Sequence, residues 1–102
     1  MHLIDILLPR MDNSGTAFSA EEFELVRQEL AAQFGGVTAH LRSPAAGLWQ
    51  DDSGKLCSDE IVIFEVMSEA LDRIWWIDYR RQLEARFRQK EIVVRVVIVE
   101  RI

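Results

Sequence analysis

The segment Glu91–Ile102, in which eight of twelve residues are aliphatic, predicts a long final strand and constrains the fold more than any other part of the sequence. Most of these residues are β-branched, which favours a strand. Successive side chains of a strand point to opposite faces. One face would carry Ile92, Val94, Val96 and Ile98, and the other Val93, Arg95, Val97 and Val99. Both faces are therefore largely apolar, and a sheet that contains this strand needs cover on both sides.

The segment 19–36 predicts a helix with defined ends. Ser19 followed by Glu22 is a capping box, in which each side chain accepts a hydrogen bond from the other residue's backbone N–H. Gly35 and Gly36 supply the left-handed residue that ends many helices. The apolar residues between these ends recur at helical spacing on one side, namely Phe23, Val26, Leu30 and Phe34.

Three further segments have strand patterns. Residues 3–8 are aliphatic except for Asp5, residues 37–42 alternate between apolar and polar, and residues 61–66 are apolar except for Glu65. Pro44 and Gly47 predict a bulge or bend before Trp49. The acidic, Gly-containing residues 51–54 then predict the tip of a hairpin.

A second helix is expected after the third strand. Ser68 is its predicted N-cap, with Glu69 and Asp72 in the first turn. Basic residues gather toward its end, where they would complement the helix dipole, namely Arg80, Arg81, Arg86, Arg88 and Lys90. The residues expected to face the core are Leu71, Trp75, Tyr79, Leu83 and Phe87, with Trp76 at the edge of that stripe and Ile74 and Ile77 pointing away.

The order of these elements is strand, helix, strand, strand, helix, strand. This order predicts a ferredoxin-like βαββαβ fold of the α+β class, in which a four-stranded antiparallel sheet carries both helices on one face. We expect a single domain over residues 1–102. The outer face would then keep several aliphatic side chains, and contiguous apolar patches are uncommon on monomers. The sequence therefore predicts a homodimer formed through that face.

One polar row is expected on the outer face. If Gln50 lies opposite Lys55 in the hairpin, His40 lies opposite Glu65. The first strand lies between the third and the last in this fold, which adds Asp5 and Arg95 to the row. The candidate site residues are therefore His40, Glu65, Asp5 and Arg95. They combine an imidazole that titrates near neutral pH, two carboxylates and a fixed cation. This set could be a charge network inside an interface, or it could perform acid–base chemistry on a small molecule.

Composition excludes several classes of function. The net charge of −5 opposes nucleic-acid binding and binding to anionic membranes. The two histidines, His2 and His40, are too few for a zinc site, and the glycines do not form a phosphate loop, so no metal or cofactor is expected. Cys57 is the single cysteine and is interpreted as a small apolar residue in a protein of the reducing cytoplasm.

Two motifs carry a resemblance. The sequence Phe34-Gly35-Gly36-Val37-Thr38, followed by Gly47-Leu48-Trp49 before an acidic turn, resembles a group of short uncharacterised bacterial proteins with a ferredoxin-like fold. The layout is more distantly similar to dimeric α+β barrel proteins, which include small-molecule enzymes. The resemblance implies a fold and a dimer, and no active-site residue is carried over.

The function predicted from sequence is thus a cytoplasmic homodimer whose activity no motif names. Two alternatives remain open. One is a small-molecule binding protein or enzyme of the α+β barrel type that uses the outer face. The other is an adaptor that docks another protein through Ile74, Ile77 and Trp76 of the second helix.

Overall fold

The computed structural model describes residues 1–39, 45–50, 53–54 and 56–102, with the backbone alone for 45–50 and 56–59. The elements, in order along the chain, are β1 (His2–Pro9), α1 (Ala20–Phe34), β2 (Thr38–Ala39), β3 (Ala45–Gln50), β4 (Leu56–Ser68), α2 (Arg73–Arg86) and β5 (Val93–Ile98).

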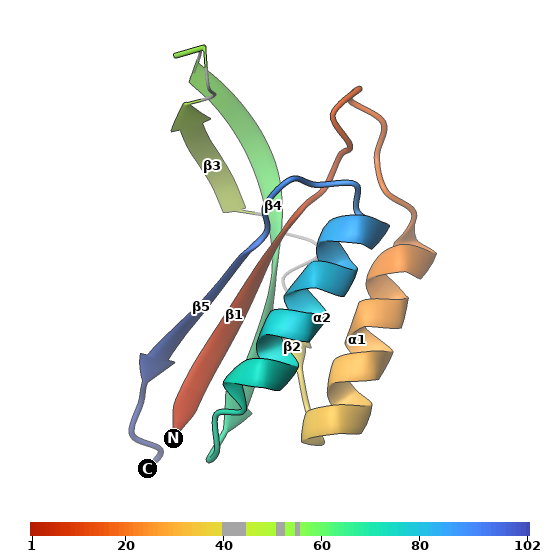
Figure 1. Ribbon diagram of the computed structural model, residues 1–102. Coiled ribbons are helices and arrows are strands. Elements are labelled where there is room, and N and C mark those ends of the chain that lie inside the picture. Colours follow the sequence, from red (N-terminus) through yellow and green to blue (C-terminus); the bar gives the residue numbers. More distant parts are fainter. Residues whose placement is uncertain (40–44, 51–52, 55) are drawn as a thin grey trace.

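The strands form one antiparallel sheet, with both helices on one of its faces (Figure 1). The strand order is β2-β4-β1-β5, and β3 also pairs with β4. The first strand is therefore central, and β5 lies at one edge. This arrangement confirms the predicted ferredoxin-like α+β fold. Neither α1 nor α2 has the length and hydrophobicity that a helix needs to cross a membrane, over the part of the chain that the structure describes.

The second predicted strand is divided into two pieces that lie along the same side of β4. In β2, Thr38 lies opposite Glu65, so paired residue numbers sum to 103. In β3, Gln50 lies opposite Leu56, so they sum to 106. The pairing thus shifts by three residues between the two pieces, as expected from the interruption that the sequence predicts before Trp49. The predicted constant register, with Gln50 opposite Lys55, is wrong, because the three-residue shift changes which residues of the two strands lie opposite each other.

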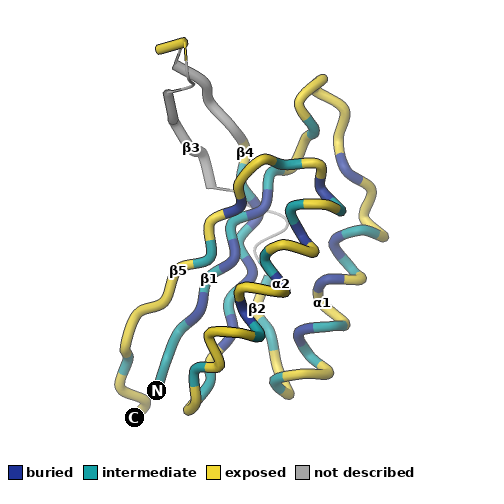
Figure 2. The backbone as a smooth tube through the Cα atoms, in the orientation of Figure 1, coloured by how far each residue is buried: buried dark blue, intermediate teal, exposed yellow. Residues whose placement is uncertain are grey.

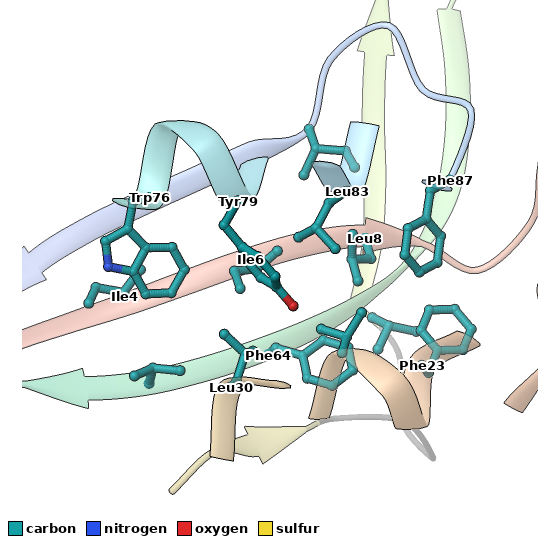
Figure 3. Packing of buried hydrophobic residues seen from close by; sticks show 14 of the residues in the cluster. Ile4, Ile6, Leu8, Phe23, Leu30, Phe64, Trp76, Tyr79, Leu83 and Phe87 are labelled. Atoms are coloured by element: carbon teal, nitrogen blue, oxygen red, sulfur yellow. The ribbon is translucent and has the colours of Figure 1, made fainter. Parts of the chain in front are cut away.

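The core lies between the helices and the inner face of the sheet (Figure 3). Alternate residues of β1 and β4 point toward the helices and are almost completely buried, as the two-residue period of a strand requires. They pack against the apolar sides of both helices. The buried strand residues are Ile4, Ile6, Leu8, Val62, Phe64 and Val66, and the buried helix residues are Phe23, Val26, Leu30, Trp76, Tyr79 and Leu83.

Helix α1 has the ends that the sequence predicts. The Glu22 N–H donates to Ser19 Oγ at 3.3 Å, and the Ser19 N–H donates to the Glu22 carboxylate at 3.2 Å. Gly35 has φ +79° and its N–H donates to the Ala31 carbonyl. These contacts satisfy backbone groups that have no partner inside the helix.

Helix α2 starts later than predicted. Its N-cap is Asp72, whose carboxylate accepts a hydrogen bond from the Trp75 N–H at 3.1 Å. Ser68 is the last residue of β4, opposite His2, and its hydroxyl donates to the Ala70 carbonyl. The predicted Ser68 cap is wrong because pairing with β1 keeps the chain extended through that residue. Glu69 and Asp72 accordingly precede the helix.

The buried side of α2 also differs in part from the prediction. Trp76 is buried, whereas Trp75 and Leu71 are only partly buried at the margin of the core. Trp76 stacks on Phe34 of α1 with ring centroids 5.1 Å apart. The helix therefore turns toward α1 as well as toward the sheet. As expected, Ile74 and Ile77 are left outside the core.

Candidate functional site

The outer face, defined as the sheet face away from the helices, carries a polar row between two apolar rows. Strand register fixes these rows, because directly opposite residues of antiparallel strands share a face. The polar row consists of Glu65, Asp5 and Arg95 on β4, β1 and β5. The flanking rows are Met67, Leu3 and Val97 on one side and Ile63, Leu7 and Val93 on the other.

Asp5 lies at the centre of the polar row. Arg95 Nε donates to Asp5 Oδ2 at 3.2 Å. The Asp5 side chain is 13% exposed, whereas that of Arg95 is 55% exposed. Asp5 Oδ1 is shielded from solvent and accepts no hydrogen bond from any described residue. A shielded carboxylate oxygen without a donor is costly, so this atom is suited to an additional donor or positive charge.

Glu65 lies directly opposite Asp5 on the neighbouring strand. The Arg10 N–H donates to the Glu60 carbonyl at 2.9 Å, and alternation along the ladder then makes Asp5 and Glu65 a pair without hydrogen bonds between their backbones. Such pairs bring Cα atoms to about 4.5 Å. Two carboxylates thus lie close together beside one guanidinium. The shielded Asp5 Oδ1 favours a cation or a hydrogen-bond donor over an anion.

The structure brings together three of the four predicted site residues, Asp5, Glu65 and Arg95. The fourth, His40, lies outside the described residues. The β2 residue opposite Glu65 is Thr38, so the predicted opposition of His40 and Glu65 is wrong. The change of register between β2 and β3 is the cause, since it removes the constant pairing on which that prediction depended.

A second charged cluster, not predicted from the sequence, connects the two helices. Arg86 of α2 makes a two-pronged contact with the Glu29 carboxylate of α1, with Nη2 to Oε2 at 2.7 Å. The Tyr79 hydroxyl donates to Glu29 Oε1 at 3.1 Å. The hydrogen bonds from Arg86 hold the pKa of Glu29 below its ordinary value, and burial raises the pKa of Tyr79.

The contact with Glu29 gives Arg86 a role that the sequence interpretation did not include. Besides lying near the helix end, Arg86 neutralises a half-buried carboxylate on the other helix. Its partner is 57 residues away in the chain, so no local spacing indicates the pair. The side chains of Glu29, Tyr79 and Arg86 bind one another. We therefore interpret the cluster as structural.

Glu29→Gln should therefore reduce stability at neutral pH by on the order of 1 kcal/mol. Because the pKa of Glu29 is lowered in the folded protein, its contribution is present above the unfolded pKa and is lost as the pH falls through the folded value. The free energies of unfolding of wild type and variant, from urea denaturation, should differ at pH 7 and differ less at acidic pH. Glu24→Gln, at a solvent-exposed pair with Arg27 within α1, is the control and should have a smaller effect. An equal difference in the free energy of unfolding between wild type and Glu29→Gln at both pH values would contradict the role of an ionised Glu29.

Metal binding finds no support in the described part of the chain. No group of three or more His, Cys, Asp or Glu side chains gathers there in a way that could hold an ion. The side chains of Cys57 and Trp49 lie outside the described residues.

No family model and no curated protein matches this sequence. Two solved structures of a phage SAM lyase are similar in fold. The structure in complex with S-methyl-5'-thioadenosine has a TM-score of 0.63 and 14% identity, and the alignment covers 94% of this chain and 79% of that chain. The apo structure has a TM-score of 0.62 and 14% identity, with 94% and 78% covered. At this identity the likeness shows the α+β fold alone, which agrees with the expected distant similarity to α+β barrel proteins.

Proposed function

We propose that this chain is a homodimeric protein that binds a small organic cation on its outer face. The observation that carries the proposal is Asp5, whose Oδ1 is shielded and has no donor among the described residues. A carboxylate placed among aliphatic side chains destabilises a sheet unless its charge is neutralised. Arg95 contacts only the other oxygen. A bound cation would supply the missing partner.

The exposed apolar rows of the outer face are the evidence for self-association. Met67, Val93 and Val97 are each about half exposed, at 53%, 49% and 50%, and they flank the polar row on both sides. Two-fold self-association is the commonest way in which soluble proteins cover such a face. Covering the face would also exclude water from Asp5. The attraction between its carboxylate and a cation would then increase, because the effective dielectric constant falls.

The surroundings of Asp5 favour a ligand whose positive charge is bordered by apolar groups. Leu3 and Leu7 lie on either side of Asp5 along β1, and Glu65 lies opposite Asp5 on β4. A sulfonium ion, with three carbon substituents on a charged sulfur, has this character. The phage enzyme of similar fold is named a SAM lyase and was solved with a thioadenosine. We therefore propose adenosyl sulfonium compounds as the ligand class, and the cytoplasm, where an unpaired thiol stays reduced, as the location.

Thermal-shift titration tests the proposal. S-adenosylmethionine should raise the melting temperature in a concentration-dependent way, since a ligand that binds only the folded state stabilises it. S-adenosylhomocysteine, the neutral thioether, should raise it less. Asp5→Asn keeps the shape of the side chain and removes its charge, so the difference between the two ligands should disappear. Asp78→Asn, the same change on the exposed side of α2, should leave it intact.

Two results would contradict the proposal. One is the absence of any shift with either compound, and the other is an equal preference for S-adenosylmethionine in wild type and in Asp5→Asn. Chromatography of the same samples separates binding from catalysis. Release of S-methyl-5'-thioadenosine from S-adenosylmethionine, absent in Asp5→Asn, would make the protein an enzyme.

A further inference from the structure

A groove lies between α2 and β5, on the helix side of the sheet. Its volume is about 210 Å³. Its lining from α2 recurs at positions i, i+3, i+4 and i+7, which form one face of a helix. Val96 of β5 is 37% exposed and Ile77 of α2 is 41% exposed, so both walls can be reached from solvent (Figure 2). The lining residues are Leu71, Arg73, Trp76, Ile77, Arg80, Val94 and Val96.

The groove combines positive charge with apolar walls. Two of its lining residues are arginines, five are apolar, and none of those contributed by the described part of the chain is acidic. The protein as a whole has a net charge of −5. The groove is therefore opposite in sign to the rest of the chain. A concave site lined by one sign of charge concentrates ligands of the other sign, so this site is suited to an anion.

Arg80 lacks a complete set of hydrogen-bond partners. Its Nε is shielded from solvent and donates to no acceptor among the described residues. Glu84 Oε2 is its ion-pair partner, but the 4.0 Å between Nε and this oxygen exceeds the length of a hydrogen bond. The same Glu84 oxygen accepts a hydrogen bond from the Ile92 N–H at 3.0 Å. Because a shielded donor without an acceptor is costly, Arg80 is suited to an additional oxygen ligand.

Arg73 adds a second positive charge at the start of α2. Asp72 caps this helix through the Trp75 N–H, and the first turn itself contains no acidic residue. A cation at a helix N-terminus is unfavourable because it opposes the helix dipole. The Arg73 guanidinium forms no ion pair with another residue that the structure describes. Helix stability and ion pairing therefore do not account for Arg73, whereas an anion in the groove would.

We propose that this groove binds a small organic anion, namely a carboxylate attached to a compact apolar group. The carboxylate would lie against the Arg80 guanidinium, whose parallel N–H groups match its two oxygens. Binding would turn the guanidinium so that its Nε–H faces the carboxylate. The apolar group would contact Ile77 and Val96. Since a cavity of about 150 Å³ binds benzene, a groove of about 210 Å³ has room for one ring and its carboxylate.

Both parts of such a ligand are needed. A small hydrated anion such as acetate could contact Arg80, but it would remove little apolar surface from water. Burial of apolar surface is favourable at about 25 cal/mol per Å². An uncharged analogue of the same shape would bury that surface and lose the charge-assisted hydrogen bonds. The groove should therefore prefer an apolar carboxylate to either of these compounds.

This site is separate from the proposed cation site at Asp5. Val94 and Val96 lie opposite Ile6 and Ile4, which are buried on the helix side of the sheet. Asp5 lies on the outer face. The two ligands would therefore bind on opposite sides of the sheet, and the groove proposal does not depend on the proposed function.

Titration of the full chain with phenylacetate, followed by two-dimensional NMR of the backbone amides, tests the proposal. Phenylacetate should move the signals of residues 73–80 and 94–96 in a saturable way. Phenylacetamide, which has the same shape without the charge, and acetate, which lacks the ring, should each bind about tenfold more weakly or worse. The absence of saturable movement at these residues, or equal affinity for phenylacetamide, would overturn the proposal.

Three variants test the residues of the site. Arg80→Gln should raise the dissociation constant for phenylacetate about tenfold, because it removes the charged donor. Arg81→Gln is the matched control, since Arg81 is exposed on α2 and does not line the groove; it should leave the constant unchanged. Ile77→Glu places a negative charge in the groove wall and should prevent binding by repulsion. The spectra also show whether each variant is folded. Equal effects of the two arginine changes, or unchanged binding in Ile77→Glu, would overturn the site.

Discussion

Changing Val97 to glutamate should halve the particle mass of the protein at micromolar concentration. Val97 is 50% exposed and lies on the outer face, opposite Leu3 in the apolar row beside Asp5. In the proposed dimer its side chain would be covered by the second copy. An uncompensated charge buried in such a contact costs about 3–5 kcal/mol. The dissociation constant should therefore rise by roughly two to four orders of magnitude.

Light scattering of wild type and variant at the same concentration measures this effect. Glu24→Lys, a larger charge change on α1 away from the sheet, is the control and should keep the wild-type mass. A wild-type protein that is already monomeric would refute the outer-face dimer and, with it, a ligand site enclosed between two copies.

Phe64→Ala should be the most destabilising single substitution in the sheet. Phe64 is fully buried on the inner face of β4, and its ring stacks on Phe23 of α1 with centroids 6.5 Å apart. Removing a buried phenyl ring loses its transfer free energy and leaves a cavity, at about 3–5 kcal/mol. Urea denaturation followed by circular dichroism measures the free energy of unfolding. The change should also weaken ligand binding indirectly, because Glu65 is the next residue along β4.

Leu25→Ala is the matched control for Phe64→Ala. Leu25 is also apolar, but it lies on the solvent side of α1 and is 48% exposed. Its truncation should change the free energy of unfolding by no more than about 0.5 kcal/mol. Similar losses in the two variants would contradict the assignment of Phe64 to the centre of the core.

The first helix shows how far local sequence determines structure. Ser19, Glu22 and Gly35 each act within a few residues of their own position, and the bonds that they form are the ones expected from their spacing. Capping depends on local backbone geometry and hardly on the rest of the fold. Elements of this kind are predictable from a single sequence.

The second helix shows where local reasoning fails. Ser68 has the chemistry of an N-cap, but the β1–β4 ladder extends through it and Asp72 takes that role. The burial of Trp76 in preference to Trp75 depends on Phe34 of α1, which stacks on it. In both cases a partner far away in the sequence decided between two locally acceptable arrangements.

The polar row was predictable only in part. The topology of the fold alone brings β1 between β4 and β5, and it therefore places Asp5 next to both Glu65 and Arg95. The assignment of His40 depended on a constant hairpin register. A shift of three residues between β2 and β3 replaced that partner with Thr38.

The final strand separates what the sequence determined from what the tertiary structure decided. Alternation of side chains is a local property of an extended backbone, so the sequence was sufficient to predict that both faces of β5 are apolar and that both need cover. It could not specify which face the helices take. That choice depends on the pairing of β5 with β1 and on the path of the chain over the sheet, which involve contacts about ninety residues apart. Only the structure places Val94 against the core and leaves Val97 and Arg95 on the outer face beside Asp5.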